Sequence, residues 1–337
     1  MTRLCTIQPG DIPSPMMADY YGQRVSEGGL EIRGVNIPTR SYLGAASFYY
    51  DGQMEDWRAI ANAVQAKGSR AFVQLIHGGR QSHVEVTGGD DSIAPSVVSF
   101  DSVALTKNGF VPVWLHRALE TEEIPGIIEE FRVATQRALD AGFDGVKLHG
   151  ANGYLVDQFI EDGTNKHTDA FGGPIENRGR FLREAVEALI SVWGAERVGV
   201  RISSSGQWGG ISDSNPEATL GYVAKVLDRY KLAYLHVIEP RVMDTETLVE
   251  GQAPVSHRPF CARSSAARSS PRVASIAREP SRFCNVAKPI WSPSGAGSHR
   301  TRICRSAPPR TSVAHFDREA SWGGDQRGYI DFPAFAA

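Results

Sequence analysis

The sequence is poor in cysteine and contains no long apolar run. Its 337 residues include 4 cysteines, which show neither the spacing of metal ligands nor that of a paired disulfide framework. We therefore expect reduced thiols and no bound metal. No apolar signal-peptide core follows Met1, and no later stretch is apolar for long enough to predict a membrane span. These absences favour a cytoplasmic protein without a membrane partner.

The chain also lacks a large excess of either charge. It has 36 Lys and Arg residues against 38 Asp and Glu residues, and the net charge of −2 argues against a nucleic-acid partner. This balance hides one basic segment, residues 252–311, which holds ten arginines and one lysine against Glu279 alone. The segment carries a net charge of +10 and shows neither a helical nor a strand period, so it differs from the rest of the chain.

Short β-branched segments alternate with amphipathic ones over most of the remaining sequence. Alternation of this kind predicts an α/β fold with a parallel sheet. No Gly-x-Gly-x-x-Gly motif opens a helix after an early strand, so we favour a (β/α)8 TIM barrel over a dinucleotide-binding sheet. A possible hairpin at Asn108-Gly109 interrupts a long polar stretch, residues 81–118. The expected strands are 30–37, 71–76, 143–148, 197–203 and 233–238, and the expected helices are 16–27, 54–66, 124–141, 176–192 and 216–230.

Three polar side chains follow the expected strand 143–148 on a glycine-punctuated turn, namely His149, Asn152 and Tyr154. In parallel α/β proteins, the loops at the carboxyl ends of the strands form the ligand-binding face. A histidine and an asparagine three residues apart can both donate hydrogen bonds to one oxygen, and a nearby phenol can supply a proton. The alternative is a buried structural histidine followed by a turn-forming asparagine. The clustering at a strand end favours an active site.

Two longer motifs surround these residues. Residues 147–155, Lys-Leu-His-Gly-Ala-Asn-Gly-Tyr-Leu, resemble the active-site strand of the Old Yellow Enzyme family of flavin-dependent ene-reductases. Residues 165–181, Asn-Lys-His-Thr-Asp-Ala-Phe-Gly-Gly-Pro-Ile-Glu-Asn-Arg-Gly-Arg-Phe, are similar to the longest signature of that family. The resemblance covers about residues 2–251 and returns near 313–333.

The resemblance implies a (β/α)8 barrel that binds FMN without a covalent bond. Gln74 would then hydrogen-bond the pyrimidine edge of the flavin, and Arg201 would lie beside its N1 and O2 atoms. Thr2 would bond the flavin carbonyl near N5, and Gly34 would allow close approach beneath the ring. Without the resemblance, Gln74 is more simply a solvated amide at a strand end, and Arg201 a partner in a salt bridge across the barrel mouth.

The resemblance also implies a reaction. His149 and Asn152 would hold the oxygen of an α,β-unsaturated carbonyl or nitro compound, and Tyr154 would deliver a proton to the α-carbon. NAD(P)H would be the reductant of the flavin. We therefore expect a small-molecule enone or nitro substrate. The sequence does not indicate which oligomeric state the protein has.

The same comparison divides the chain into three parts. Residues 1–251 form the barrel portion, although Thr2-Arg3 resembles the end of the first family strand, so that strand is expected to be missing. Residues 252–312 stand where strands seven and eight belong, and residues 313–337 form a family-like tail. The middle part is either a disordered basic linker or, as we favour, a frameshifted stretch of coding sequence. The alternative function is therefore a non-catalytic, cofactor-free remnant of the family.

Overall fold

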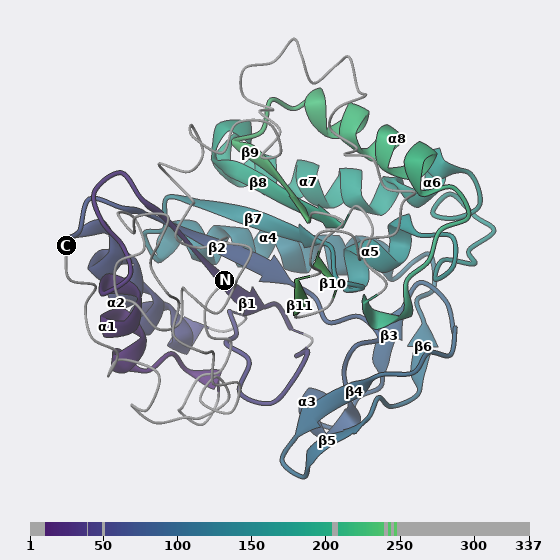
Figure 1. Cartoon of the computed structure of the whole chain (residues 1–337), viewed down its shortest axis with the longest axis horizontal. Coiled ribbons are helices and arrows are strands. Elements are labelled where there is room, and N and C mark those ends of the chain that lie inside the picture. The colour runs from purple at the N-terminus through teal and green to yellow at the C-terminus, as the bar shows by residue number, and fades with distance from the viewer. Residues whose placement is uncertain are drawn as a thin grey trace.

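The centre of the fold is a parallel sheet with its strands in sequence order (Figure 1). The computed structural model describes residues 11–38, 40–48, 51–203, 208–238, 242–243 and 246–247. All neighbouring strands of the sheet run parallel, and the order never reverses. Connections that always advance in one direction build the wall of a barrel and not a doubly wound sheet. The strands are β1 (Leu30–Asn36), β2 (Arg70–Ile76), β7 (Gly145–Gly150), β8 (Val198–Ser203) and β9 (Tyr234–Ile238).

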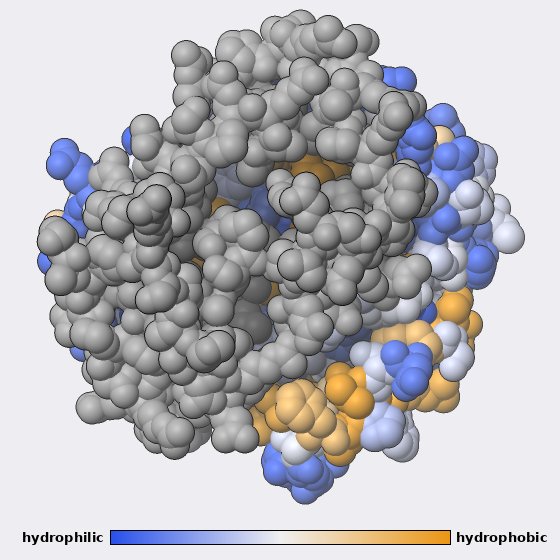
Figure 2. Space-filling model, viewed as in Figure 1, coloured by the Kyte–Doolittle hydropathy of each residue, from blue (hydrophilic) through white to orange (hydrophobic). Residues whose placement is uncertain are grey.

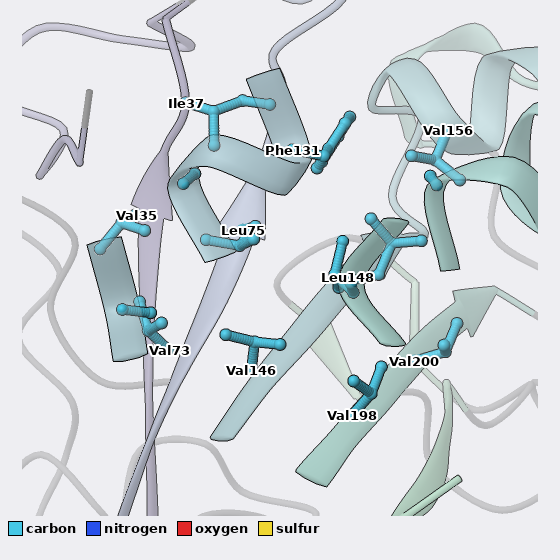
Figure 3. Close-up of a cluster of buried hydrophobic side chains, with 14 of the residues drawn as sticks. Val35, Ile37, Val73, Leu75, Phe131, Val146, Leu148, Val156, Val198 and Val200 are labelled. Carbon is cyan, nitrogen blue, oxygen red and sulfur yellow. The ribbon is translucent and has the colours of Figure 1, made fainter. Parts of the chain in front are cut away.

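The long helices all pack against one face of this sheet. Alternate residues of the strands form that face, and Figure 3 shows Val73, Leu75, Val146 and Leu148 in one apolar cluster with Phe131 of α4. The period of two therefore separates an apolar, helix-covered face from a concave face that carries the other side chains. The covering helices are α1 (Pro15–Gly22), α2 (Met54–Gln65), α4 (Ile124–Asp140), α7 (Arg180–Trp193) and α8 (Pro216–Asp228), with shorter helices α3 (Val84–Thr87), α5 (Leu155–Ile160) and α6 (Ile175–Arg178).

Two aromatic rings fill the concave face near the amino ends of the strands. The ring centroids of Phe72 and Tyr234 lie 5.9 Å apart. The neighbouring strands carry glycine there: a Cβ atom on Gly145 would lie 2.4 Å from Phe72 Cζ, and one on Gly199 would lie 2.5 Å from Tyr234 Cζ. Large rings thus pack against positions without side chains, and this layer closes the floor beneath the polar residues described below.

The segment between β2 and α4 leaves the sheet as a small excursion (Figure 1). Strands β4 (Val103–Thr106) and β5 (Gly109–Pro112) pair as an antiparallel hairpin, which confirms the hairpin predicted at Asn108-Gly109. Strands β3 (Ser92–Ala94) and β6 (His116–Ala118) pair in parallel at its base. Apolar residues gather on its surface (Figure 2), and the large exposed ones include Val103, Phe110, Trp114 and Leu115.

Most predicted elements are present, with shifted ends. The strand predicted over 143–148 begins only at Gly145. Phe143 instead takes part in the turn that caps the carboxyl end of α4, where its N–H donates to the Ala138 carbonyl at 3.1 Å. The helix predicted over 16–27 was too long, since α1 ends at Gly22. The helix predicted over 176–192 is divided between α6 and α7.

Several predictions fall outside the described part of the chain. These are the missing first strand, the irregular segment 252–312 and the family-like tail 313–337. Within the described ranges, no helix combines the length and the apolar character needed to cross a membrane.

Candidate active site

Four of the predicted site residues lie on the concave face of neighbouring strands. Gly34 of β1 is in register with Gln74 of β2, and Gln74 is in register with Lys147 of β7. Two residues further along β7, His149 is in register with Arg201 of β8. Register partners in a parallel sheet point to the same side and lie about 5 Å apart. The fold therefore brings residues from four separate strands to one face near the carboxyl ends.

His149 is a neutral imidazole that offers one N–H group. Its Nε2 atom lies 3.4 Å from Nη1 of Arg201, and because a guanidinium only donates, Nε2 is the acceptor. The ring then carries its proton on Nδ1, which has no hydrogen-bond partner among the described residues. Burial, followed by the charges of Arg201 and Lys147, holds the pKa of His149 well below its usual value. A buried donor without a partner is suited to binding a ligand oxygen.

Tyr154 packs against the edge of this imidazole. The two ring centroids are 4.9 Å apart, and the planes are inclined at 79°. Burial raises the pKa of the Tyr154 phenol to about 12, although the charge of Arg201 opposes the shift. The hydroxyl is therefore protonated at neutral pH and is able to donate a proton.

Asn152 lies in the turn between β7 and α5 with a left-handed backbone, φ 59°. Its N–H donates to Ser203 Oγ at 2.9 Å, and its carbonyl accepts from Gln81 Nε2 at 2.7 Å. The backbone is thus held from β8 on one side and from the loop after β2 on the other. Its side-chain Oδ1 is buried and has no hydrogen-bond partner within the described ranges. The turn fixes this residue through its main chain and leaves the amide for a ligand.

The concave face is electropositive. Lys147 Nζ lies 3.4 Å from Nδ1 of His236, a residue of β9 that is in register with Arg201. Burial lowers the pKa of Arg201 to about 10, so this side chain remains cationic at neutral pH. Burial and the charge of Arg201 hold the pKa of Lys147 well below its usual value, while Glu31 opposes the shift. The arrangement favours a ligand that carries or develops negative charge.

Loops at the mouth are joined by Arg80. Its Nη2 donates to the carbonyl of Gly209 at 2.7 Å and to that of Gly210 at 3.0 Å, and its guanidinium lies 4.1 Å from the ring centroid of Phe100. Nearby, the Gly79 N–H donates to Nδ1 of His77 at 3.1 Å. Arg80 thus joins the loops after β2 and β8, and His77 stabilises the turn directly after β2.

Sequence reasoning missed three residues that the structure adds to the site. Lys147 had a signal, because it precedes His149 by two positions and therefore points to the same side of the strand. Ser203 and Asp157 had none, since their role depends on contacts between β8 and the turn. Thr2, the remaining predicted residue, lies outside the described part of the chain. No group of three metal-ligating side chains occurs within that part.

Comparison with known proteins gives consistent matches. A family model described as the NADH:flavin oxidoreductase / NADH oxidase family matches residues 1–266. Flavin oxidoreductase hxnT of Emericella nidulans is 38% identical over 250 residues, which cover 71% of this chain and 64% of that protein. The putative 12-oxophytodienoate reductase-like protein 1 of Arabidopsis thaliana is 39% identical over 245 residues, covering 72% of this chain and 74% of that protein. The chain thus spans less than two thirds of the first of these relatives.

Solved structures show the same likeness. Morphinone reductase in complex with tetrahydroNAD superposes with a TM-score of 0.82 at 33% identity, covering 100% of this chain and 93% of that one. The Old Yellow Enzyme homologue from Zymomonas mobilis has a TM-score of 0.79 at 28% identity, with 99% and 95% covered. These neighbours are (β/α)8 barrels, which confirms the predicted fold class.

Proposed function

Because this chain belongs to the NADH:flavin oxidoreductase / NADH oxidase family, the Old Yellow Enzyme family, we propose that it is an FMN-dependent ene-reductase. It would use NAD(P)H to reduce the activated C=C bond of small α,β-unsaturated carbonyl or nitro compounds. The observation that carries this proposal is the neutral His149, whose Nδ1–H has no partner in the described structure and which lies between Arg201 and Tyr154.

The residues on the concave face have the chemistry to hold an FMN ring. Gln74 is fully buried there, and an amide can both donate to and accept from the pyrimidine edge of a flavin. Arg201 would place a cation near N1 and O2, where a reduced flavin carries negative charge. Gly34, the register partner of Gln74, would allow the ring to approach the backbone, and Thr2 is the proposed partner of the carbonyl near N5. When bound, FMN would accept a hydride from the nicotinamide and pass one to the alkene.

The substrate side of the site would be formed by the turn after β7. The Nδ1–H of His149 and the side-chain amide of Asn152 would donate to the carbonyl or nitro oxygen. Such donors help most in the transition state, because negative charge builds on that oxygen as the alkene is reduced. Tyr154, protonated at neutral pH, would deliver a proton to the α-carbon.

A nicotinamide reductant is supported by one solved neighbour, morphinone reductase, whose structure contains tetrahydroNAD. The name of the Arabidopsis relative, a putative 12-oxophytodienoate reductase-like protein, supports an unsaturated carbonyl substrate. For this chain both assignments are proposals, as is the choice between NADH and NADPH.

The division of the chain is also proposed. Residues 1–251 would be the barrel portion, 252–312 an irregular basic segment and 313–337 a family-like tail. The family match ends at residue 266, early in the basic segment, which supports a boundary in this region. Sequencing the encoding DNA tests the frameshift: an alternative frame that encodes a strand-rich segment over 252–312 would support it, and the lack of one would reject it.

The proposed function is tested by measuring FMN retention and then reduction and reoxidation of the bound flavin. The full-length chain is mixed with FMN, desalted and examined by visible absorption. A retained flavin band that bleaches with NADPH or NADH and returns with cyclohexenone is the expected result. Gln74→Ala should weaken FMN retention, whereas Gln136→Ala, on the surface of α4, should not.

The outcomes separate the proposal from its alternative. Two results would contradict the ene-reductase. In the first, the folded protein retains no FMN. In the second, the bound flavin is reduced by the nicotinamide but is not reoxidised by cyclohexenone or a nitroalkene. The first of these results would instead support a cofactor-free remnant of the family.

A further inference from the structure

We propose that Asp157 is a positioning residue that holds the turn carrying Asn152 and Tyr154 against the end of β8. This inference deepens the proposed function and rests on it. Asp157 lies in the first turn of α5, and neither composition nor motif marked it as part of the site.

The contacts form a chain of hydrogen bonds across two elements. Asp157 Oδ2 accepts from the Gly153 N–H at 2.8 Å, and the Asp157 carboxylate also bonds the Ser203 hydroxyl. Ser203 Oγ in turn accepts from the Asn152 N–H at 2.9 Å. Because the serine hydroxyl has one proton and already accepts from Asn152, it donates to the carboxylate. The Asp157 carboxylate is therefore linked to two consecutive backbone amides of the turn, to Gly153 directly and to Asn152 through Ser203.

This turn needs such support. Asn152 and Gly153 both have left-handed backbones, with φ values of 59° and 67°. Asparagine tolerates that conformation better than most non-glycine residues, and surrounding contacts are what hold it there. Asn152 and Tyr154 flank Gly153, so the bond to the Gly153 amide restrains two of the three side chains proposed to contact substrate.

The Asp157 carboxylate is buried where the turn meets β8. Asp157 is 1% exposed and Ser203 is 3% exposed. A buried carboxylate costs free energy unless charged or hydrogen-bonding groups compensate it. The compensation here comes from the amide of Gly153, the hydroxyl of Ser203 and the charge of Arg201 on β8. All three groups belong to the turn or to β8, the two elements that the carboxylate joins.

The carboxylate also titrates near neutrality. Burial raises the pKa of Asp157 to about 7, and the bonds from Gly153 and Ser203 and the charge of Arg201 oppose that shift. The titratable groups that interact with it are Glu161, directly after α5, and Arg201 on β8. Protonation below that pH removes the charge that orders the turn.

Hydrogen–deuterium exchange of the Asn152 and Gly153 amides tests the positioning directly and needs no bound flavin. Asp157→Asn removes the charge at constant size, and Ser203→Ala breaks the link to Asn152 while leaving the residues of α5 unchanged. Both variants should accelerate exchange of this turn about tenfold or more, because Asp157→Asn weakens a charge-assisted bond to the Gly153 amide and Ser203→Ala removes the acceptor of the Asn152 amide. Glu187→Gln, which removes a partly exposed carboxylate on α7, is the control and should leave exchange unchanged.

The catalytic consequence is measured in the flavin-loaded protein. Reoxidation of the reduced flavin by cyclohexenone should slow about 10- to 100-fold in Asp157→Asn and Ser203→Ala. Reoxidation by molecular oxygen should stay unchanged, because it does not use the turn that binds the carbonyl group of the enone. In wild type the enone step should slow as the pH falls below about 7, and Asp157→Asn should lose this dependence.

Unchanged exchange in both variants would overturn the proposal, and so would faster exchange with an unaltered enone step. An effect of Asp157→Asn that Ser203→Ala fails to reproduce would indicate simple capping of α5 and would also overturn it. A wild-type protein that reduces no enone would instead refute the proposed function, and the exchange measurement would still decide whether Asp157 orders the turn.

Discussion

Nη1 of Arg201 lies 3.4 Å from Nε2 of His149, although the two residues come from different strands. Burial and this contact together keep the imidazole neutral, because the loss of water and the charge of Arg201 both lower the pKa of His149 and the guanidinium occupies the acceptor nitrogen. The role proposed for His149 is therefore that of a neutral hydrogen-bond donor through Nδ1.

The first prediction concerns this donor. His149→Ala should reduce kcat/KM for an enone by about 10²-fold, since it removes one donor to the developing oxyanion. Flavin retention should not change, because Gln74 and Arg201 remain. Enone binding in wild type should show no titration from His149 between pH 6 and pH 8. A binding step near pH 6.5 that disappears in the variant would contradict the neutral donor.

The second prediction concerns His77, which is fully buried after β2. Burial lowers the pKa of His77 to about 3, so the unfolded chain takes up a proton below about pH 6.5 and the folded chain does not. This residue therefore makes the free energy of unfolding fall as the pH drops below 6.5 and towards 3. In His77→Asn, the amide oxygen can still accept from Gly79, but the titration is lost.

Urea unfolding of wild type and His77→Asn at pH 8 and pH 5 measures this effect. Between pH 8 and pH 5, the free energy of unfolding of wild type should fall by roughly 2 kcal/mol more than that of His77→Asn. A difference that stays constant over this range would show that His77 does not contribute to the pH dependence.

The third prediction concerns the ion pair of Arg178 and Asp213, whose N···O distance is 2.6 Å. Their side chains are 5% and 0% exposed. Arg178→Met leaves a buried carboxylate without its cation and should cost about 3–5 kcal/mol of stability. The control is Arg183→Met on α7, where the pair with Glu187 is exposed and worth less than about 1 kcal/mol. Thermal or urea midpoints that shift equally in the two variants would be inconsistent with this difference.

The fourth prediction concerns the floor of the concave face. Gly199→Ala would place a Cβ atom 2.5 Å from Tyr234 Cζ, and the Tyr234 ring is held by Phe72. The overpacking should destabilise the protein by about 1–3 kcal/mol. Gly221→Ala, within α8 where the added atom meets nothing within 4 Å, should instead stabilise it by up to about 1 kcal/mol. Opposite signs of the shift in unfolding midpoint are the expected result.

The strands and helices were predictable because their signals are local. The short apolar run of β2 and the period of 3.6 in α4 are properties of neighbouring residues, and both elements lie close to the predicted bounds. The ends were less predictable, as at Phe143, whose N–H completes the end of α4 instead of starting β7. The turn at Asn108-Gly109 was predictable because Gly109 takes a positive φ that few other residues tolerate.

The sequence by itself determined the family, the barrel class and the residue types that follow strand 143–148, because motifs and periodicity are written in consecutive positions. Only the tertiary structure decided the protonation of His149, the burial of Lys147 and the link from Asp157 through Ser203 to Asn152. Each of these depends on a partner about 50 or more residues away or on the loss of water around the group. Desolvation and long-range proximity arise only when the strands assemble, and no local pattern encodes them.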